Sequence, residues 1–128
     1  MGPLVLIVDN SEFARHQLAE PLRLAGFEIV EAESAQEALE IISTRKVALM
    51  ISDVHMPGMD GIELSEHLHA AALPSKPPII MISTETNAEK KARAKRAGVK
   101  AWIVKPPNLP SVIATAMELT GMAEAKTP

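Results

Sequence analysis

The sequence predicts an α/β fold in which five parallel strands alternate with five helices. Two observations predict it. Five short apolar runs with β-branched residues recur along the 128 residues, and a segment with helical periodicity follows each of them. The links are short, so right-handed crossovers should place helices on both faces of one parallel sheet. Periodicity does not determine the strand order, but the length and the five βα units fit the flavodoxin-like order 2-1-3-4-5.

The predicted strands are the five apolar runs. Each is nearly continuous, without polar alternation, which is typical of parallel strands that are buried on both faces. They cover residues 4–8, 27–30, 47–51, 79–82 and 101–104. Side chains that directly follow these strands should gather at the carboxyl edge of the sheet, where open α/β sheets bind ligands.

The first two predicted helices begin at capping residues. Ser11 should cap a helix that ends before Gly26, and Pro21 should kink its last turns. Residues 34–37 have a capping-box pattern, which predicts a second helix that ends before Lys46.

The remaining helices are delimited by proline and glycine. Prolines within 74–78 stop the third helix, and glycines follow the fourth and fifth. The predicted ranges are 62–71, 87–97, and from Asn108 or Ser111 to 119. One domain should therefore cover residues 1–121, followed by a tail or linker at 122–128.

Composition narrows the possible classes. The chain has no cysteine, which excludes disulfides, thiolate catalysis and cysteine-ligated metals. Its first apolar run is cut by Asp9, lacks a basic flank and is too short for a signal or membrane-spanning segment. A soluble, cytoplasmic protein without membrane insertion is expected.

The charge is distributed unevenly. Residues 1–63 carry eleven acids and four bases, whereas residues 64–128 carry five acids and nine bases. Six of these bases lie within residues 90–100, with few aromatic residues nearby to stack on bases, so direct nucleic-acid binding is only weakly supported. The basic fourth helix is then either a solvated face, as such helices usually are, or a surface for an acidic protein segment, which is the sharper hypothesis.

Polar residues follow four of the predicted strands at their carboxyl ends. They are Asp9-Asn10, Asp53, Ser83-Thr84 and Lys105-Pro106. Acidic groups that bind a hard cation, a carboxylate that can act as a nucleophile, a hydroxyl and a lysine together suit phosphoryl transfer. Asp53 is the candidate nucleophile.

On these residues, the chain resembles the receiver domain of two-component response regulators, a group that includes the chemotaxis receiver proteins, over residues 4–121. The motifs that carry the likeness are residues 4–9, 51–53, 56–61, 79–83 and 104–106. The separations of 44, 30 and 22 residues between Asp9, Asp53, Ser83 and Lys105 are also similar to the family's.

The resemblance implies a phosphorylated signalling domain. Asp53 would accept a phosphoryl group from phosphohistidine on a histidine kinase or a histidine phosphotransfer protein, and Lys105 and Ser83 would bind phosphoryl oxygens. The Lys105-Pro106 bond is expected to be cis. The ligands of Mg²⁺ would be Asp9, Asn10, Asp53 and the backbone carbonyl of His55.

The resemblance also implies how the signal leaves the domain. The domain would catalyse its own phosphotransfer and dephosphorylation. Apart from these reactions it would be a signalling domain and not an enzyme. Phosphorylation would switch a protein-binding surface formed by the fourth helix, the fifth strand and the fifth helix.

Asn10 departs from the family pattern. The family normally has a second acid there, which is a direct metal ligand, and an amide oxygen ligates without charge. We therefore expect phosphorylation with a raised Mg²⁺ requirement. The alternative is a pseudo-receiver that binds proteins independently of phosphorylation.

Four residues are expected to tune the site. Thr84 stands where the family usually has a smaller residue and should narrow access to the phosphorylation site. His55 and Glu85 occupy positions that set acyl-phosphate lifetime in the family, and we expect an ion pair between them. Trp102 replaces the Tyr or Phe that turns inward in the family, and its larger indole is less suited to that movement.

Two other classes fit the sequence less well. An FMN-binding flavodoxin would have a loop rich in Ser, Thr and Gly after the first strand, where this chain is acidic. A hydrolase that forms an aspartyl phosphate would have an acid two residues after Asp53, where His55 stands.

Overall fold

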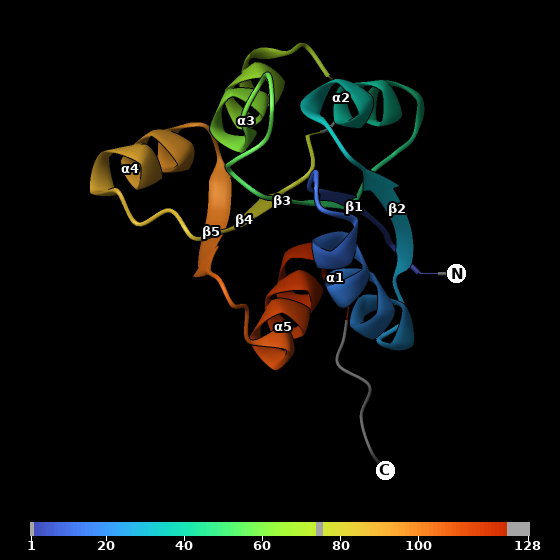
Figure 1. Ribbon diagram of the computed structural model, residues 1–128. Coiled ribbons are helices and arrows are strands. Elements are labelled where there is room, and N and C mark those ends of the chain that lie inside the picture. The colour runs from blue at the N-terminus through green and yellow to red at the C-terminus, as the bar shows by residue number, and fades with distance from the viewer. Residues whose placement is uncertain (1, 74–75, 123–128) are drawn as a thin grey trace.

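The computed structural model describes residues 2–73 and 76–122 of the chain. Strands and helices alternate strictly along it (Figure 1). The strands are β1 (Leu4–Val8), β2 (Glu28–Ala32), β3 (Leu49–Ser52), β4 (Ile79–Ser83) and β5 (Val99–Val104). The helices are α1 (Glu12–Leu24), α2 (Ala35–Thr44), α3 (Gly61–Ala70), α4 (Ala88–Arg96) and α5 (Leu109–Thr120).

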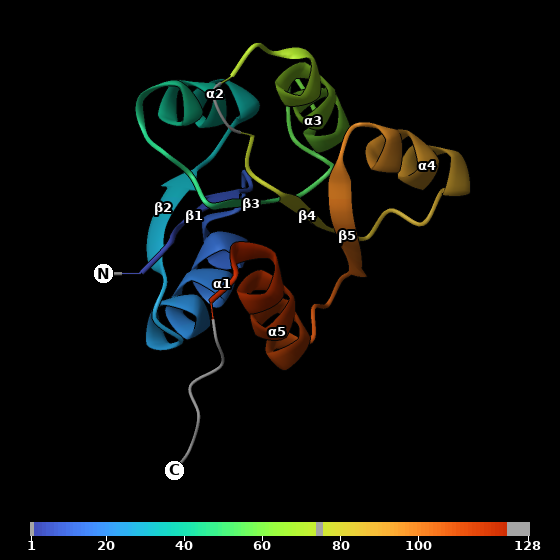
Figure 2. The same ribbon diagram turned by 180° about the vertical axis from the view of Figure 1, so that it is seen from behind.

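The strands form one parallel sheet in the order β2-β1-β3-β4-β5, which confirms the predicted fold. Helices α1 and α5 cover one face, and α2, α3 and α4 lie on the other (Figures 1 and 2). Strands β1, β3 and β4 consist almost entirely of apolar residues, and all of these residues are buried. Both faces of the central sheet are therefore covered.

Alternate residues of the strands separate the core into two layers. Val5 and Ile7 of β1 pack with Leu18 and Leu22 of α1, whereas Leu6 packs on the opposite face. A shift of one residue in a strand would exchange these layers, so the central strands have a well-specified register.

Several element boundaries differ from the prediction. Strand β2 runs on to Ala32 because its polar residue Glu31 pairs with a side chain of α1 and therefore fits an edge strand. Strand β3 runs from Leu49 to Ser52 instead of 47–51, and the N–H of Ala48, directly before it, donates to the Leu4 carbonyl. Helix α1, in contrast, ends at Leu24, before Gly26 as predicted, and includes Pro21.

The helix caps also correct the prediction. Ser34 caps α2 as expected, but Glu37 accepts from the N–H of Glu33 instead of from the cap residue. The complete capping box occurs at α3, where Asp60 and Glu63 each accept from the other's backbone N–H. Of the two caps proposed for α5, Asn108 is the one used.

Two further predictions concern the ends of the chain and the membrane. The predicted tail at 122–128 lies, except for Met122, outside the described residues. Within the described part of the chain, no helix combines the length and the apolar character that crossing a membrane requires.

Candidate functional site

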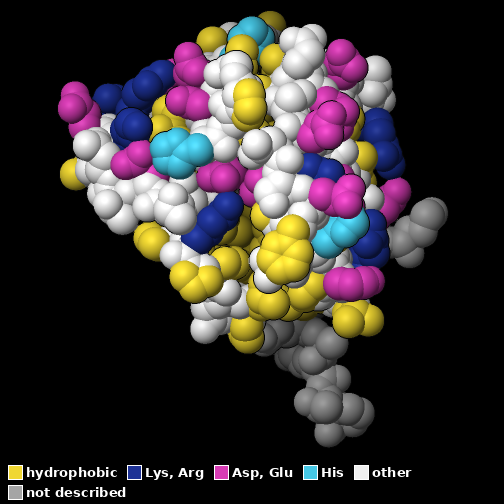
Figure 3. Space-filling view, in the orientation of Figure 1, with side chains coloured by type: hydrophobic (Ala, Val, Ile, Leu, Met, Phe, Trp, Pro, Cys, Tyr) yellow, Lys and Arg dark blue, Asp and Glu magenta, His cyan; other side chains and the backbone are white. Residues whose placement is uncertain are grey.

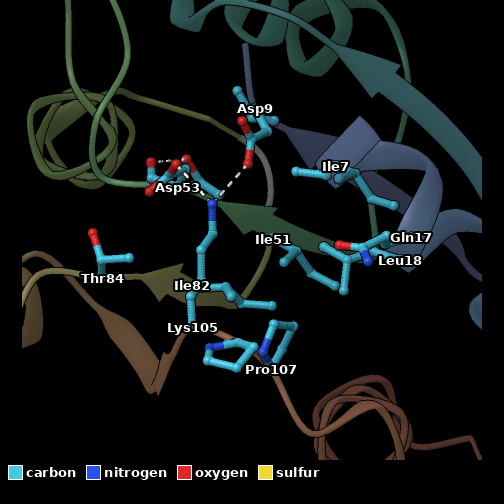
Figure 4. A pocket seen from close by; sticks show the side chains of 14 residues that line it. Ile7, Asp9, Gln17, Leu18, Ile51, Asp53, Ile82, Thr84, Lys105 and Pro107 are labelled. Carbon is cyan, nitrogen blue, oxygen red and sulfur yellow. Dashed lines mark hydrogen bonds and ion pairs between the residues drawn. The ribbon is translucent and has the colours of Figure 1, made fainter. Parts of the chain in front are cut away.

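Two aspartates and a lysine meet at the carboxyl edge of the sheet. The Nζ atom of Lys105 lies 3.0 Å from Oδ2 of Asp53 and 3.3 Å from Oδ2 of Asp9 (Figure 4). The three residues directly follow β5, β3 and β1, so the parallel sheet brings together positions that lie far apart in the sequence. The side chains of Asp9 and Asp53 are only 7% and 11% exposed.

The aspartates determine the charge of Lys105. Partial burial favours the neutral amine, but the hydrogen bond to Asp53 and the charges of Asp53 and Asp9 outweigh it and raise the pKa of Lys105 above its ordinary value. Lys105 therefore remains cationic at neutral pH. Together the three groups carry a formal charge of minus one, which suits the approach of a further cation.

The backbone around Asp53 is tightly fixed. Its N–H donates to the carbonyl of Val8 at 3.0 Å, and its Oδ1 accepts from the N–H of His55 at 3.3 Å. A Cβ atom on Gly61 would overlap the carbonyl oxygen of Asp53, so glycine is required at the start of α3. Sequence reasoning missed this role, because a glycine after a capping residue gives no signal of what lies beside it.

Asp9 is fixed at least as firmly. Its Oδ1 accepts from the N–H of Ser11 at 2.9 Å, and its own N–H donates to the Ala32 carbonyl at 3.1 Å. The guanidinium of Arg15 donates to the Asp9 carbonyl at 2.6 Å. Arg15 was not identified from the sequence as part of the site, because its spacing is that of an ordinary helix residue.

Ser83 is the last residue of β4, which lies between β3 and β5, and Thr84 directly follows it. Ser83 is fully buried, and its Oγ accepts from the N–H of Glu85 at 3.2 Å. Its carbonyl accepts from the N–H of Lys105, so the two residues are neighbours through the backbone. Thr84 is exposed and lines the cavity beside Asp53 and Lys105 (Figure 4).

The oxygen atoms around Asp9 and Asp53 fit a hard cation. Asp9 and Asp53 provide two carboxylates, Asn10 is exposed next to Asp9, and His55 is two residues beyond Asp53. Within the residues described, no group of three or more His, Cys, Asp or Glu could hold a metal. Magnesium in proteins is commonly held by one or two carboxylates, with water and phosphate oxygens filling the remaining positions. The donor set therefore suits Mg²⁺ better than a metal that needs a complete protein cage.

The expected contact between His55 and Glu85 is present. The His55 Nε2 atom lies 3.3 Å from Oε1 of Glu85, which also lies 3.1 Å from Nζ of Lys90. The N–H of Asn87 donates to the other oxygen of Glu85, and this bond, followed by the one from Lys90, lowers the pKa of Glu85 below its ordinary value. Glu85 thus presents a charged carboxylate to His55.

Trp102 connects β5 to the loop between β4 and α4. Its indole N–H donates to the backbone carbonyl of Glu85 at 3.2 Å, and the side chain packs partly against the core. The Nζ atom of Lys91 lies 5.8 Å from the centre of the ring, within the range of a cation–π interaction. The indole therefore reaches the loop that carries Thr84 and Glu85.

An apolar cavity of about 370 Å³ opens beside Asp53 and Lys105 (Figure 4). Buried side chains of Ile7, Leu18, Ile51 and Ile82 line it. Hydrophobic side chains also gather on the surface over α1 and α5, whereas charged side chains cover α4 (Figure 3). The site thus has an apolar flank and a charged one.

Comparison with known proteins identifies the family. The response regulator receiver domain family matches residues 5–117, which include every residue of this site. The chain belongs to this family. Receiver domains are signalling domains of two-component systems. Phosphorylation and Mg²⁺ binding are typical of them, and their partners are histidine kinases, phosphotransfer proteins and downstream effectors.

Individual relatives agree with this assignment. The chain is 32% identical over 131 positions to the phosphate regulon transcriptional regulatory protein PhoB of Pseudomonas aeruginosa, covering 100% of this chain and 57% of that protein. It is 37% identical over 110 residues to the transcriptional regulatory protein PdtaR of Mycobacterium tuberculosis, covering 85% and 52%. The chain thus spans about half the length of these curated relatives.

Solved structures show the same fold. The chemotaxis protein CheY4 of Vibrio cholerae superposes with a TM-score of 0.85 at 34% identity, covering 93% of this chain and 99% of that one. A putative response regulator from Chloroflexus aurantiacus gives a TM-score of 0.87 at 27% identity, covering 94% and 99%.

Proposed function

We propose that this receiver domain is phosphorylated on Asp53 by a phosphohistidine donor in the presence of Mg²⁺. The observation that carries the proposal is the meeting of Asp53, Asp9 and Lys105 at the carboxyl edge of the sheet, with the lysine 3.0 Å from the proposed nucleophile. A nucleophile, a metal-binding carboxylate and a cation are the groups that this transfer requires.

In the proposed reaction, a carboxylate oxygen of Asp53 attacks the phosphorus atom. An oxygen–phosphorus bond forms, the phosphorus–nitrogen bond breaks, and its electron pair returns to the imidazole of the donor. Lys105 stabilises negative charge on the phosphoryl oxygens, for which its raised pKa keeps it protonated. Bound Mg²⁺ would offset the repulsion between the anionic nucleophile and the anionic donor.

Asp9, Asn10, Asp53 and the backbone carbonyl of His55 are the proposed metal ligands. Asn10 provides an oxygen without a charge, so we expect Mg²⁺ to bind more weakly than it would beside an aspartate at this position. Hydrolysis returns the acyl phosphate to the free carboxylate and inorganic phosphate. Thr84 and the pair of His55 with Glu85 stand beside Asp53 and are proposed to set the rate of this step.

Output would pass through α4, β5 and α5. Ser83 accepts from the N–H of Glu85, and Glu85 accepts from the Trp102 indole, so a movement of the Ser83 hydroxyl toward a phosphoryl group would disturb the loop that Trp102 contacts. The basic side chains of α4 suit an acidic protein partner. We place this function in the cytoplasm, where histidine kinases present their phosphohistidine.

A pseudo-receiver is the second candidate, and the uncharged Asn10 favours it. Incubation with acetyl phosphate, with and without Mg²⁺, followed by Phos-tag electrophoresis separates the two. The proposal expects a Mg²⁺-dependent shifted band that Asp53→Ala abolishes and that Glu40→Gln, an exposed carboxylate on α2, retains. No shift at any Mg²⁺ concentration would favour the pseudo-receiver.

A further inference from the structure

Arg15 is a buried charge that belongs to neither the nucleophile nor the proposed set of metal ligands. It lies on α1 and is 9% exposed, which makes it the one buried basic residue in the described part of the chain. Burying a charge costs free energy unless partners compensate it. The partners of Arg15 therefore indicate what it is held in place to do.

One partner is the backbone of Asp9. Strand β1 ends at Val8, and the N–H of Asp9 makes the last contact with β2, at the Ala32 carbonyl. The carbonyl of Asp9 lies beyond the paired strands, and Nη1 of Arg15 donates to it at 2.6 Å. The guanidinium thus provides the hydrogen bond that a neighbouring strand would donate to this carbonyl within a sheet.

That carbonyl also sets the position of the next residue. The Asp9 carbonyl and the Asn10 N–H belong to one planar peptide group, so holding the oxygen fixes the plane from which Asn10 starts. The side chain of Asp9 is fixed in the same region, because the Ser11 N–H donates to its Oδ1 at 2.9 Å. The positions of the Asp9 and Asn10 side chains therefore both depend on this one peptide.

The second partner, Glu31 on β2, orients the guanidinium. Its Oε1 lies 2.9 Å from Nε of Arg15 and 3.8 Å from Nε2 of His16, and its Oε2 lies 4.0 Å from Nη2 of Arg23. Helix α1 lies beside β2 (Figures 1 and 2), so Glu31 connects the two elements. Arg15 uses separate nitrogens for Glu31 and Asp9, and a lysine has only one.

We infer that Arg15 is a positioning residue that holds the Asp9–Asn10 peptide and thereby sets the geometry of the metal side. The inference extends the proposed function, because the metal role of Asp9 and Asn10 rests on it. Removing a residue that orients a metal ligand commonly lowers metal affinity by 10 to 100-fold. An arginine that holds a ligand by its backbone belongs to this class.

The first experiment measures amide hydrogen exchange by NMR in metal-free protein, where neither Mg²⁺ nor phosphorylation is involved. In Arg15→Met, the Ser11 amide should exchange about tenfold faster, because Asp9 loosens and the bond to its Oδ1 weakens. The Asp53 amide, which donates to Val8, should keep its rate. Arg15→Lys should give a smaller change in the same direction.

The second experiment titrates the same variants with Mg²⁺ by calorimetry. Arg15→Met should raise the dissociation constant about tenfold. Arg45→Met is the matched control, because it removes an arginine that pairs with Glu28 on β2 at 3.1 Å and does not contact the site. It should leave the dissociation constant unchanged.

The outcomes separate the inference from the function on which it rests. Ser11 exchange that stays unchanged in Arg15→Lys and in folded Arg15→Met would overturn the inference, and Arg15→Lys decides alone if the methionine variant does not fold. The variants could instead show faster Ser11 exchange while the wild type binds no Mg²⁺. That result would uphold Arg15 as the residue that holds Asp9 and would refute the proposed function.

Discussion

The α1 side and the α4 side of the site hold their polar groups in different ways. On the α1 side, Asp9 and Arg15 have side chains that are 7% and 11% exposed and are fixed by direct hydrogen bonds. On the α4 side, His55 and Lys90 surround Glu85 with side chains that are 53% and 47% exposed. Buried hydrogen-bonded groups keep one geometry, whereas exposed ion pairs stabilise a structure little and rearrange at low cost.

This difference suits the two tasks of a phosphorylated switch. The α1 side, which is proposed to bind metal, would need fixed ligands, because their spacing determines affinity. The α4 side, which is proposed to signal, would need contacts that a new charge on Asp53 can redirect. Four predictions test whether the sides differ as described.

The largest effect is expected when the cation at the centre of the site is removed. Lys105→Met leaves two neighbouring carboxylates without their shared cation and removes the group that is proposed to bind the phosphoryl oxygens. The rate of phosphorylation by acetyl phosphate should fall about 100-fold. The control is Lys90→Met on the α4 side, which should change the rate less than about threefold, since Glu85 is the one acid that Lys90 pairs with among the described residues. Equal losses in both variants would contradict the comparison.

The backbone of Asp53 provides the next test. Gly61→Ala places a Cβ against the Asp53 carbonyl and should reduce the free energy of unfolding in urea by about 3 kcal/mol. Gly58→Ala is the matched control, because Gly58 has a positive φ of 77° but no atom within 4 Å of an added Cβ. It should cost about 1 kcal/mol. A smaller loss for Gly61→Ala than for Gly58→Ala would show that this backbone is not rigid.

A third prediction concerns the missing charge on the metal side. Asn10→Asp adds a carboxylate beside Asp9 and should lower the Mg²⁺ dissociation constant on the order of tenfold. Calorimetry measures it directly. Glu33→Gln, which removes an exposed acid at the start of α2, controls for the net charge of the protein and should have little effect. An unchanged constant in Asn10→Asp would refute the role given to Asn10.

The smallest effect is expected on the α4 side. Glu66 of α3 makes two hydrogen bonds of 2.7 Å with Arg93 of α4, and these lower the pKa of Glu66 below its unfolded value of 4.5. The pair therefore stabilises the fold above pH 4.5. That contribution is lost as the pH falls through the lowered pKa that Glu66 has in the folded protein. Wild type should exceed Glu66→Gln in stability slightly at pH 7 and lose this advantage as the pH falls below 4.5. A difference that grows toward low pH would contradict the assignment.

The two sides also differ in how far the sequence predicts them. The core strands are predictable because a continuous apolar run such as Leu4–Val8 has only one arrangement in which both of its faces are buried. Asp9, Asp53 and Lys105 are predictable because they stand at strand ends, which a parallel sheet brings to one edge. The pair of His55 with Glu85 was expected from the family resemblance and is present.

Long-range contacts on the α1 side could not be predicted. Arg15 reads as an ordinary helix residue, and its role depends on Glu31, sixteen residues away on an edge strand. Gly61 is required by the Asp53 backbone, which only the folded loop brings near it. The end of β2 was missed for the same reason, since a charged strand residue becomes acceptable only when its partner is known.

The most direct test of the account is the location of the phosphoryl group. Protein incubated with acetyl phosphate and Mg²⁺ is reduced with borohydride, which converts an aspartyl phosphate to homoserine, and its peptides are sequenced by mass spectrometry. If Asp53 is phosphorylated in a Mg²⁺-dependent reaction, homoserine should occur at position 53 and should be absent from a sample prepared with EDTA. An unmodified Asp53 in protein that carries phosphate elsewhere would contradict it.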